Sequence, residues 1–175
     1  SAIADYPGIR RVAHGIEVIS VSDDWEGEDK KTNSSKRDPI AHQLYRNYLL
    51  NESAKIYNAQ VCYVDKKRWK GLVASHIVPF NECEGLGHKE WEYDGDNGLL
   101  LSPNIDAYFD KFDISFDTDG TLLMPDDEQV IKKEIKEIIS KYKLDGSVLN
   151  NRRLEYLNIH KKRFMNKHSC KCSEK

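Results

Sequence analysis

The segment that decides the fold begins at residue 72 with Leu-Val-Ala-Ser-His-Ile-Val-Pro-Phe, continues through an acidic loop, and ends over residues 96–110 with Asp-Asn-Gly-Leu-Leu-Leu-Ser-Pro-Asn-Ile-Asp-Ala-Tyr-Phe-Asp. The first apolar run carries His76 at its end. Pro79 then stops the strand, because proline cannot donate a hydrogen bond to a neighbouring strand. This part of the chain therefore predicts a short strand that ends in a histidine.

A second strand and a helix are predicted after the acidic loop. Residues 98–101 form another apolar run. Ser102 is a typical N-cap residue, and Pro103 suits the first position of a helix. Strand, loop, strand and helix make a compact unit, which we expect to bring together three polar side chains in one cleft: His76, Asn97 and Asp106.

This unit resembles the HNH endonuclease family, whose core holds a histidine at the end of one strand, an asparagine before the next and a metal ligand on the helix. The resemblance rests on Ala-Ser-His-Ile-Val-Pro at residues 74–79 and Asp-Asn-Gly-Leu-Leu-Leu-Ser-Pro at 96–103. Further family-like positions are Arg46, Leu49, Leu50, Cys62, Phe109, Asp110, Tyr156, Leu157 and His160. It implies an α+β fold with a ββα-metal (HNH) core, flanking helices and an extra β-hairpin.

The domain boundaries follow from composition and from the extent of the resemblance. We expect residues 1–38 to form an N-terminal strand (residues 16–21) and a polar linker, residues 39–167 the nuclease domain, and residues 168–175 a flexible tail. Within the domain, apolar spacing predicts the remaining elements: helices at 40–59 (with a break near Asn51), 127–142 and 151–166, a short strand at 61–64 and a hairpin at 114–123.

The resemblance assigns catalytic roles to His76 and Asn97. A histidine suits the general base because its ordinary pKa lies near neutral pH. Asn97 cannot titrate, so the expected role of its amide is to hold the loop backbone or to fix the His76 ring. Read without the family pattern, His76 is a capped core histidine and Asn97 a turn residue before Gly98.

The implied metal ligand is Asp106, a hard oxygen donor that favours Mg²⁺ or Mn²⁺ over Zn²⁺. Many relatives have an acidic residue directly before the histidine, but this chain has Ser75 there. Asp110 lies one helical turn after Asp106, where it is equally well read as a second ligand or as a structural acid. The metal set predicted from the sequence is therefore Asp106, Ser75 and Asp110.

Two basic segments are candidates for binding a phosphate backbone. One is a turn that holds Lys66, Lys67 and Arg68, although such runs are often only a solvated face. The other is the predicted last helix, on which five cations are expected to face solvent: Arg152, Arg153, Lys161, Lys162 and Arg163. The formal net charge of −2 neither requires nor excludes nucleic acid.

The remaining features of the composition predict a cytoplasmic protein. Its four cysteines lack the spacing of a disulfide framework, and His168 with Cys170 and Cys172 is an irregular set for zinc. No apolar run approaches the roughly 20 residues of a membrane helix, so we expect no membrane association.

The sequence thus predicts a metal-dependent HNH endonuclease that cuts DNA, with Mg²⁺ or Mn²⁺ as cofactor and a role in restriction or phage defence. The expected partner is duplex DNA, with a homodimer or an upstream recognition domain left open. Two alternatives stand beside it: a nucleic-acid-binding module that keeps the fold without cutting, which Ser75 favours, and a nuclease acting on RNA or structured DNA.

Overall fold

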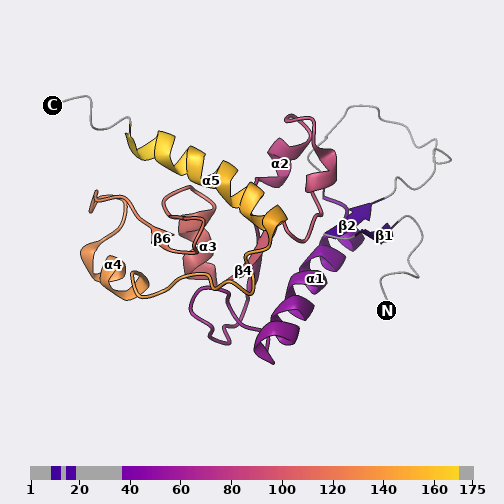
Figure 1. Cartoon of the computed structure of the whole chain (residues 1–175), viewed down its shortest axis with the longest axis horizontal. Coiled ribbons are helices and arrows are strands. Elements are labelled where there is room, and N and C mark those ends of the chain that lie inside the picture. The colour runs from indigo at the N-terminus through magenta and orange to yellow at the C-terminus, as the bar shows by residue number, and fades with distance from the viewer. Residues whose placement is uncertain (1–8, 13–14, 19–36, 170–175) are drawn as a thin grey trace.

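The computed structural model describes residues 9–12, 15–18 and 37–169, which form helices and three two-stranded antiparallel sheets (Figure 1). In chain order the elements are β1 (Ile9–Val12), β2 (Gly15–Val18), α1 (Pro39–Tyr57), β3 (Val73–His76), α2 (Phe80–Cys83), the 3-10 helix η1 (Lys89–Trp91), β4 (Gly98–Leu101), α3 (Pro103–Phe109), β5 (Ser115–Phe116), β6 (Leu122–Leu123), α4 (Lys133–Ile139) and α5 (Asn151–Ser169). This is the α+β arrangement predicted from the sequence.

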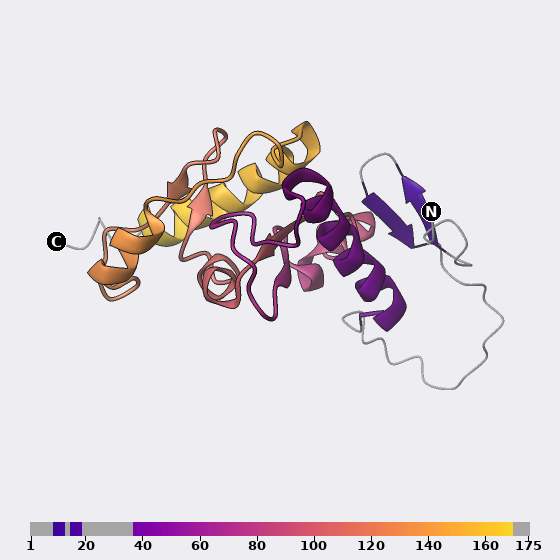
Figure 2. The same ribbon diagram turned by 90° about the horizontal axis from the view of Figure 1, so that it is seen from below.

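The N-terminal strand has a partner that the sequence did not reveal. β2 corresponds to the start of the strand predicted at residues 16–21, and it pairs with β1 in the register Ile9↔Val18. β2 lies beside α1 (Figures 1 and 2). The predicted polar linker falls mostly on residues 19–36, which lie outside the described residues.

Helix α1 is a single helix, so the break predicted near Asn51 is wrong. Asp38 caps its start by accepting hydrogen bonds from the backbone of Ile40 (2.8 Å) and Ala41 (3.2 Å). Asn51 is exposed, and a polar residue on the solvent face does not interrupt a helix whose opposite face is packed. The buried face consists of Ala41, Leu44, Tyr45, Leu49 and Ser53.

The hairpin of β3 and β4 forms where it was predicted, with Val73 opposite Leu101 and His76 opposite Gly98. All four residues of β4 are buried, which explains its unbroken apolar sequence. Gly98 is required by packing, because a Cβ there would lie 2.2 Å from the Tyr45 hydroxyl. That hydroxyl donates to the Asn97 carbonyl (2.8 Å) and so fixes the hairpin to α1.

The strand predicted at residues 61–64 does not form. The segment is buried but irregular: Ser53 Oγ accepts from the Val61 N–H (2.9 Å), and only Tyr63 bonds to the hairpin, at Leu100 O (2.8 Å). A turn from Cys62 to Lys66 follows immediately (2.9 Å). The apolar run therefore reflects burial rather than strand pairing.

The helix predicted at residues 127–142 is also shorter than expected, because α4 begins only at Lys133. The Asp127 side chain accepts from the Gln129 N–H (2.9 Å), and its carbonyl accepts from Val130 (3.1 Å) and Ile131 (3.2 Å). An aspartate that bonds to the backbone two residues later makes a turn that competes with helix formation. Residues 128–130 consequently form a turn, and the helix starts after it.

Helix α5 begins as predicted and extends to Ser169. Asn150 caps it through the Arg153 N–H (2.9 Å). Its buried stripe is Arg153, Tyr156, Leu157, His160 and Phe164, which packs against β5. The predicted hairpin is present as β5 and β6, and Gly120 takes the positive φ of 87° that its turn requires.

Candidate active site

Strand β3 presents Ser75 and His76 to opposite faces of the hairpin, because successive side chains alternate across a strand. The His76 ring stacks on Tyr45 of α1 (centroids 4.5 Å apart) and meets the edge of Phe80 (5.7 Å). Its Nε2 lies 2.7 Å from the Glu92 carbonyl oxygen. A carbonyl can only accept, so Nε2 carries the proton and Nδ1 is the basic nitrogen of the neutral ring.

The pKa of His76 is lowered to about 4. Burial is the main cause, since it penalises the charged ring, and the positive charges of Arg37 and His42 add to the shift. The bond to the Glu92 carbonyl acts in the opposite direction. His76 is therefore neutral at physiological pH and able to accept a proton.

Asn97 is fully buried and connects the two ends of the long loop between the strands. Its Oδ1 accepts from the Val78 N–H (2.7 Å), and its Nδ2 donates to the carbonyls of Val78 (3.1 Å) and Trp91 (3.0 Å). Trp91 directly precedes Glu92, the residue whose carbonyl holds His76. Asn97 thus fixes the loop backbone, and through it the orientation of the histidine ring.

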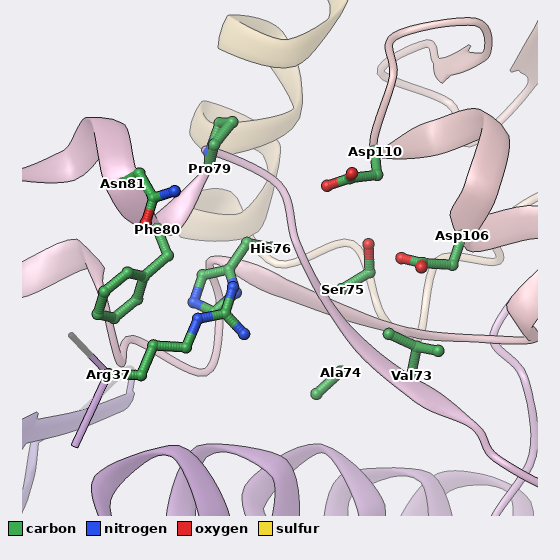
Figure 3. A pocket seen from close by; sticks show the side chains of 10 residues that line it. All are labelled: Arg37, Val73, Ala74, Ser75, His76, Pro79, Phe80, Asn81, Asp106 and Asp110. Carbon is green, nitrogen blue, oxygen red and sulfur yellow. The ribbon is translucent and has the colours of Figure 1, made fainter. Parts of the chain in front are cut away.

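On the other face of β3, Ser75 lies close to two carboxylates of the α3 segment, and all three point toward a common space (Figure 3). Ser102 caps α3 through the Ile105 N–H (3.4 Å), and Asp110 ends it one turn after Asp106, with the Asp110 N–H donating to Asp106 O (2.8 Å). The two acids therefore share one face of the helix.

The electrostatics of this group favour a bound cation. The pKa of Asp106 is raised, first because burial penalises its charge and also because Asp110 repels it. The Ser75 hydroxyl is near enough to oppose that shift, yet its Oγ is buried and has no partner in hydrogen-bond geometry. Unsatisfied oxygen donors beside two acids are the hard ligands that Mg²⁺ and Mn²⁺ prefer.

The protein offers few ligands to a metal ion at this position. Within the part of the chain that the structure describes, no group of three or more His, Cys, Asp or Glu residues is arranged to hold an ion. Two carboxylates and a hydroxyl leave most positions to water or substrate, which suits Mg²⁺ better than structural zinc. Of the tail set, His168 bonds to Phe112 O (2.9 Å), whereas Cys170 and Cys172 lie outside the described residues.

A cavity of about 370 Å³ joins the two sides of the site. It is lined by Arg37, Val73, Ala74, Ser75, His76, Pro79, Phe80, Asn81, Asp106 and Asp110. The structure thus brings together His76 and all three predicted metal ligands, while Asn97 lies behind the wall. Sequence reasoning missed Arg37, which directly precedes the cap of α1 and belongs to no motif that we recognised.

Arg153 is not available to nucleic acid, so the expectation that it faces solvent is wrong. It is fully buried, with Nη2 2.8 Å from Glu52 Oε1 and 3.8 Å from Asp96 Oδ1. Its remaining donors bond to the carbonyls of Gly95, Gly98 and Val148. Arg153 joins α5 to α1 and to the hairpin.

The other predicted phosphate-binding cations differ in exposure and pairing. Arg152 pairs with Asp94, Arg163 with Glu82, Lys161 with Asp117 (2.8 Å) and Lys66 with Asp145 (3.4 Å). Three others are exposed: Lys67, Arg68 and Lys162. Of the predicted phosphate-binding cations, only these last three have no carboxylate partner among the described residues.

No helix in the described ranges has the length and apolar character needed to cross a membrane. No curated protein shows a significant match to this sequence. Residues 60–117 match the sequence model of a family described as HNH endonuclease. These residues contain β3, the long loop, β4 and α3, and hence His76, Asn97 and the two acids of the cavity. The match confirms the predicted resemblance to the HNH endonuclease family over residues 60–117.

Proposed function

We propose that the chain is a metal-dependent endonuclease that hydrolyses phosphodiester bonds of duplex DNA. The family match over residues 60–117 supports a nuclease-type function in general. The observation that supports this best is the cavity itself. One wall carries His76, a neutral base, and another carries two carboxylates on one helix face (Figure 3). Phosphodiester hydrolysis needs a base for water and a positive charge near the phosphate, and these residues can supply or bind both.

His76 would take the proton from the attacking water at Nδ1. The Nε2–H bond to the Glu92 carbonyl prevents the ring from turning and stabilises the imidazolium that forms. Because its pKa is about 4, His76 is a weak base, but almost all of it is in the accepting form at neutral pH. Asn97 contributes by holding the backbone of Trp91 and thereby the Glu92 carbonyl.

Asp106, with Asp110 and Ser75, would hold Mg²⁺ or Mn²⁺. When bound, the ion would stabilise negative charge on the phosphate and on the departing 3′ oxygen. With so few protein ligands, binding to the free protein should be weak and should tighten when DNA supplies phosphate oxygens. Mn²⁺ should support activity at least as well as Mg²⁺, because it stands higher in the affinity series than the alkaline-earth ion.

The test is nicking of supercoiled plasmid in Mg²⁺, in Mn²⁺ and in EDTA, with Asp106→Asn beside the parent protein. We expect Asp106→Asn to remove activity at any practical Mg²⁺ concentration. Asp119→Asn is the matched control, since Asp119 is exposed and lies outside the cavity. Full activity of Asp106→Asn, or undiminished cleavage in EDTA, would disprove the metal assignment.

The presence of Ser75, in place of the acid that many relatives have, favours a second candidate, a module that binds nucleic acid without cutting it. Parallel assays with duplex DNA, single-stranded DNA, a DNA junction and RNA separate the candidates. Binding without cleavage of any of the four in Mg²⁺ or Mn²⁺ would select the module, and preferential cleavage of RNA or the junction would change the substrate.

A further inference from the structure

Arg37 occupies the wall of the cavity beside His76 and opposite the two carboxylates (Figure 3). It is the only Lys or Arg among the described residues that line this cavity. The space therefore has a cationic side and an anionic side, with the histidine between them. Such a separation of charge suits a ligand that is itself anionic and also binds a cation.

The position of Arg37 is fixed by its neighbours even though the residue is exposed. Its guanidinium lies over the Phe80 ring, 5.1 Å from the centroid. The next residue, Asp38, donates its N–H to the Tyr93 hydroxyl (2.8 Å), and Tyr93 packs edge-on against Phe80 (5.3 Å). Arg37 is thus attached to the same loop that orients His76.

The guanidinium of Arg37 also differs from those of the arginines on α5. Arg152, Arg153 and Arg163 each pair with a carboxylate. Among the described residues Arg37 has no carboxylate partner, and its guanidinium contacts the Phe80 ring. No described residue accepts a hydrogen bond from its N–H groups, whose planar arrangement fits two oxygens of one phosphate.

We propose that Arg37 is a substrate-binding residue that contacts the non-bridging oxygens of the phosphate to be cleaved. This inference rests on the proposed function and names the protein group that engages the substrate directly. Carboxylates alone repel a phosphodiester, so the anionic wall can approach it only through a bound cation. Arg37 needs no such intermediary, and it would therefore hold the phosphate on the side facing His76.

The consequence for rate follows from the charge on the phosphate. Negative charge on the oxygens is present in the bound substrate and is redistributed in the transition state, where a preorganised donor is most effective. Removing one such donor typically lowers kcat by about 10²- to 10³-fold. We expect Arg37→Gln to lower kcat by about 10²-fold and to raise KM only a few-fold. Arg37→Lys should recover part of the loss, because it keeps the charge without the planar pair of donors.

The experiment compares Arg37→Gln, Arg37→Lys and Lys141→Gln, a control that removes an equal charge from an exposed residue outside the cavity. Steady-state cleavage of a duplex gives kcat and KM. Fluorescence anisotropy with a nuclease-resistant phosphorothioate duplex in EDTA gives affinity without metal or chemistry. We expect Arg37→Gln to flatten the slope of log affinity against log salt by up to about 0.9, and Lys141→Gln to leave cleavage and slope unchanged.

The two assays separate failure of this inference from failure of the proposed function. If the parent cleaves and Arg37→Gln has the parental kcat, the inference is wrong and the endonuclease assignment stands. If no variant cleaves but Arg37→Gln alone weakens phosphorothioate binding, Arg37 binds phosphate and the proposed activity fails. If Arg37→Gln and Lys141→Gln lose kcat and affinity to the same extent, Arg37 contributes only as one of many surface charges, and the inference is wrong.

Discussion

His76 and His160 occupy closely similar surroundings in two regions of the molecule. Both rings are buried, with exposed fractions of 8% and 1%, and both have a pKa lowered to about 4, mainly by burial. Each places Nε2 against a backbone carbonyl, of Glu92 (2.7 Å) or Phe109 (2.9 Å). Each also stacks on an aromatic ring. By burial, pKa and carbonyl bonding the two histidines cannot be told apart.

The difference lies in the second ring nitrogen. Nδ1 of His160 accepts a hydrogen bond from Ser115 Oγ (2.8 Å), so this ring has no nitrogen left for chemistry. Nδ1 of His76 has no hydrogen bond to any described residue, and the ring lines the cavity that contains Asp106. A perturbed pKa therefore marks burial in both regions, and only the unused nitrogen beside open space marks a candidate base.

The largest effect that this comparison predicts is on cleavage. His76→Ala should lower the rate by about 10²- to 10⁴-fold, because a positioned base is lost. His160→Ala should lower stability instead, by about 2 to 4 kcal/mol, since it removes a packed ring and leaves Ser115 Oγ and the Phe109 carbonyl unpaired. Plasmid nicking and urea unfolding of both variants provide the measurement.

Two outcomes would break the comparison. If His76→Ala nicks plasmid at the parental rate, His76 is not the general base. A fully folded His160→Ala protein that is as inactive as His76→Ala would show that His160 takes part in the chemistry. Assays are therefore made at a temperature where circular dichroism shows each variant to be folded.

The hairpin and α3 were predictable almost to the residue, because their signals are local. Pro79, Ser102 and Pro103 mark boundaries that depend only on neighbouring backbone, and Gly98 marks a close approach. The family match covers residues 60–117, which include His76 and Asn97. Most of the hairpin and α3 could therefore be predicted from residues that are close together in the sequence.

Other features depended on residues distant in sequence and could not be predicted in this way. Arg153 is buried only because Glu52 and Asp96, from α1 and the end of the long loop, supply its counter-charges. Arg153 lies on the same face of α5 as Tyr156 and His160. Without knowledge of Glu52 and Asp96, however, an arginine on a helix is most simply interpreted as exposed to solvent. Arg37 precedes a helix cap, and only the folded loop places it beside His76.

A smaller effect is expected from acid, and it should involve both histidines. Between pH 6.5 and about 4 each ring is charged in the unfolded chain and neutral in the folded protein. The unfolded state then binds more protons, so stability is full above about pH 6.5 and falls as the pH approaches 4. The loss should be about 2 kcal/mol per histidine by pH 5.

The measurement is urea unfolding of the metal-free protein from pH 7.5 to 4.5. His160→Ala should remove about half of the decline that these two histidines cause, and His76→Ala the other half. If either substitution leaves the pH dependence of the unfolding free energy unchanged, the corresponding histidine is not neutral in the folded protein, and its carbonyl bond has a different donor arrangement.

The smallest effect on nucleic-acid binding or cleavage is expected on α5, where one cation has all its hydrogen-bonding groups paired within the fold and another is exposed. All of the Arg153 side-chain nitrogens have partners within the fold, whereas Lys162 is exposed and has no ion-pair partner among the described residues. Lys162→Gln should flatten the slope of log DNA affinity against log salt by up to about 0.9 and leave stability unchanged.

Arg153→Gln should leave the slope unchanged but destabilise the fold by about 3 to 5 kcal/mol, because Glu52 and Asp96 lose their counter-charge. Anisotropy with duplex DNA at several salt concentrations, paired with thermal unfolding, distinguishes the two. An unchanged slope in Lys162→Gln would mean that this face of α5 points away from DNA, and the exposed pair Lys67 and Arg68 would then be the basic group to replace.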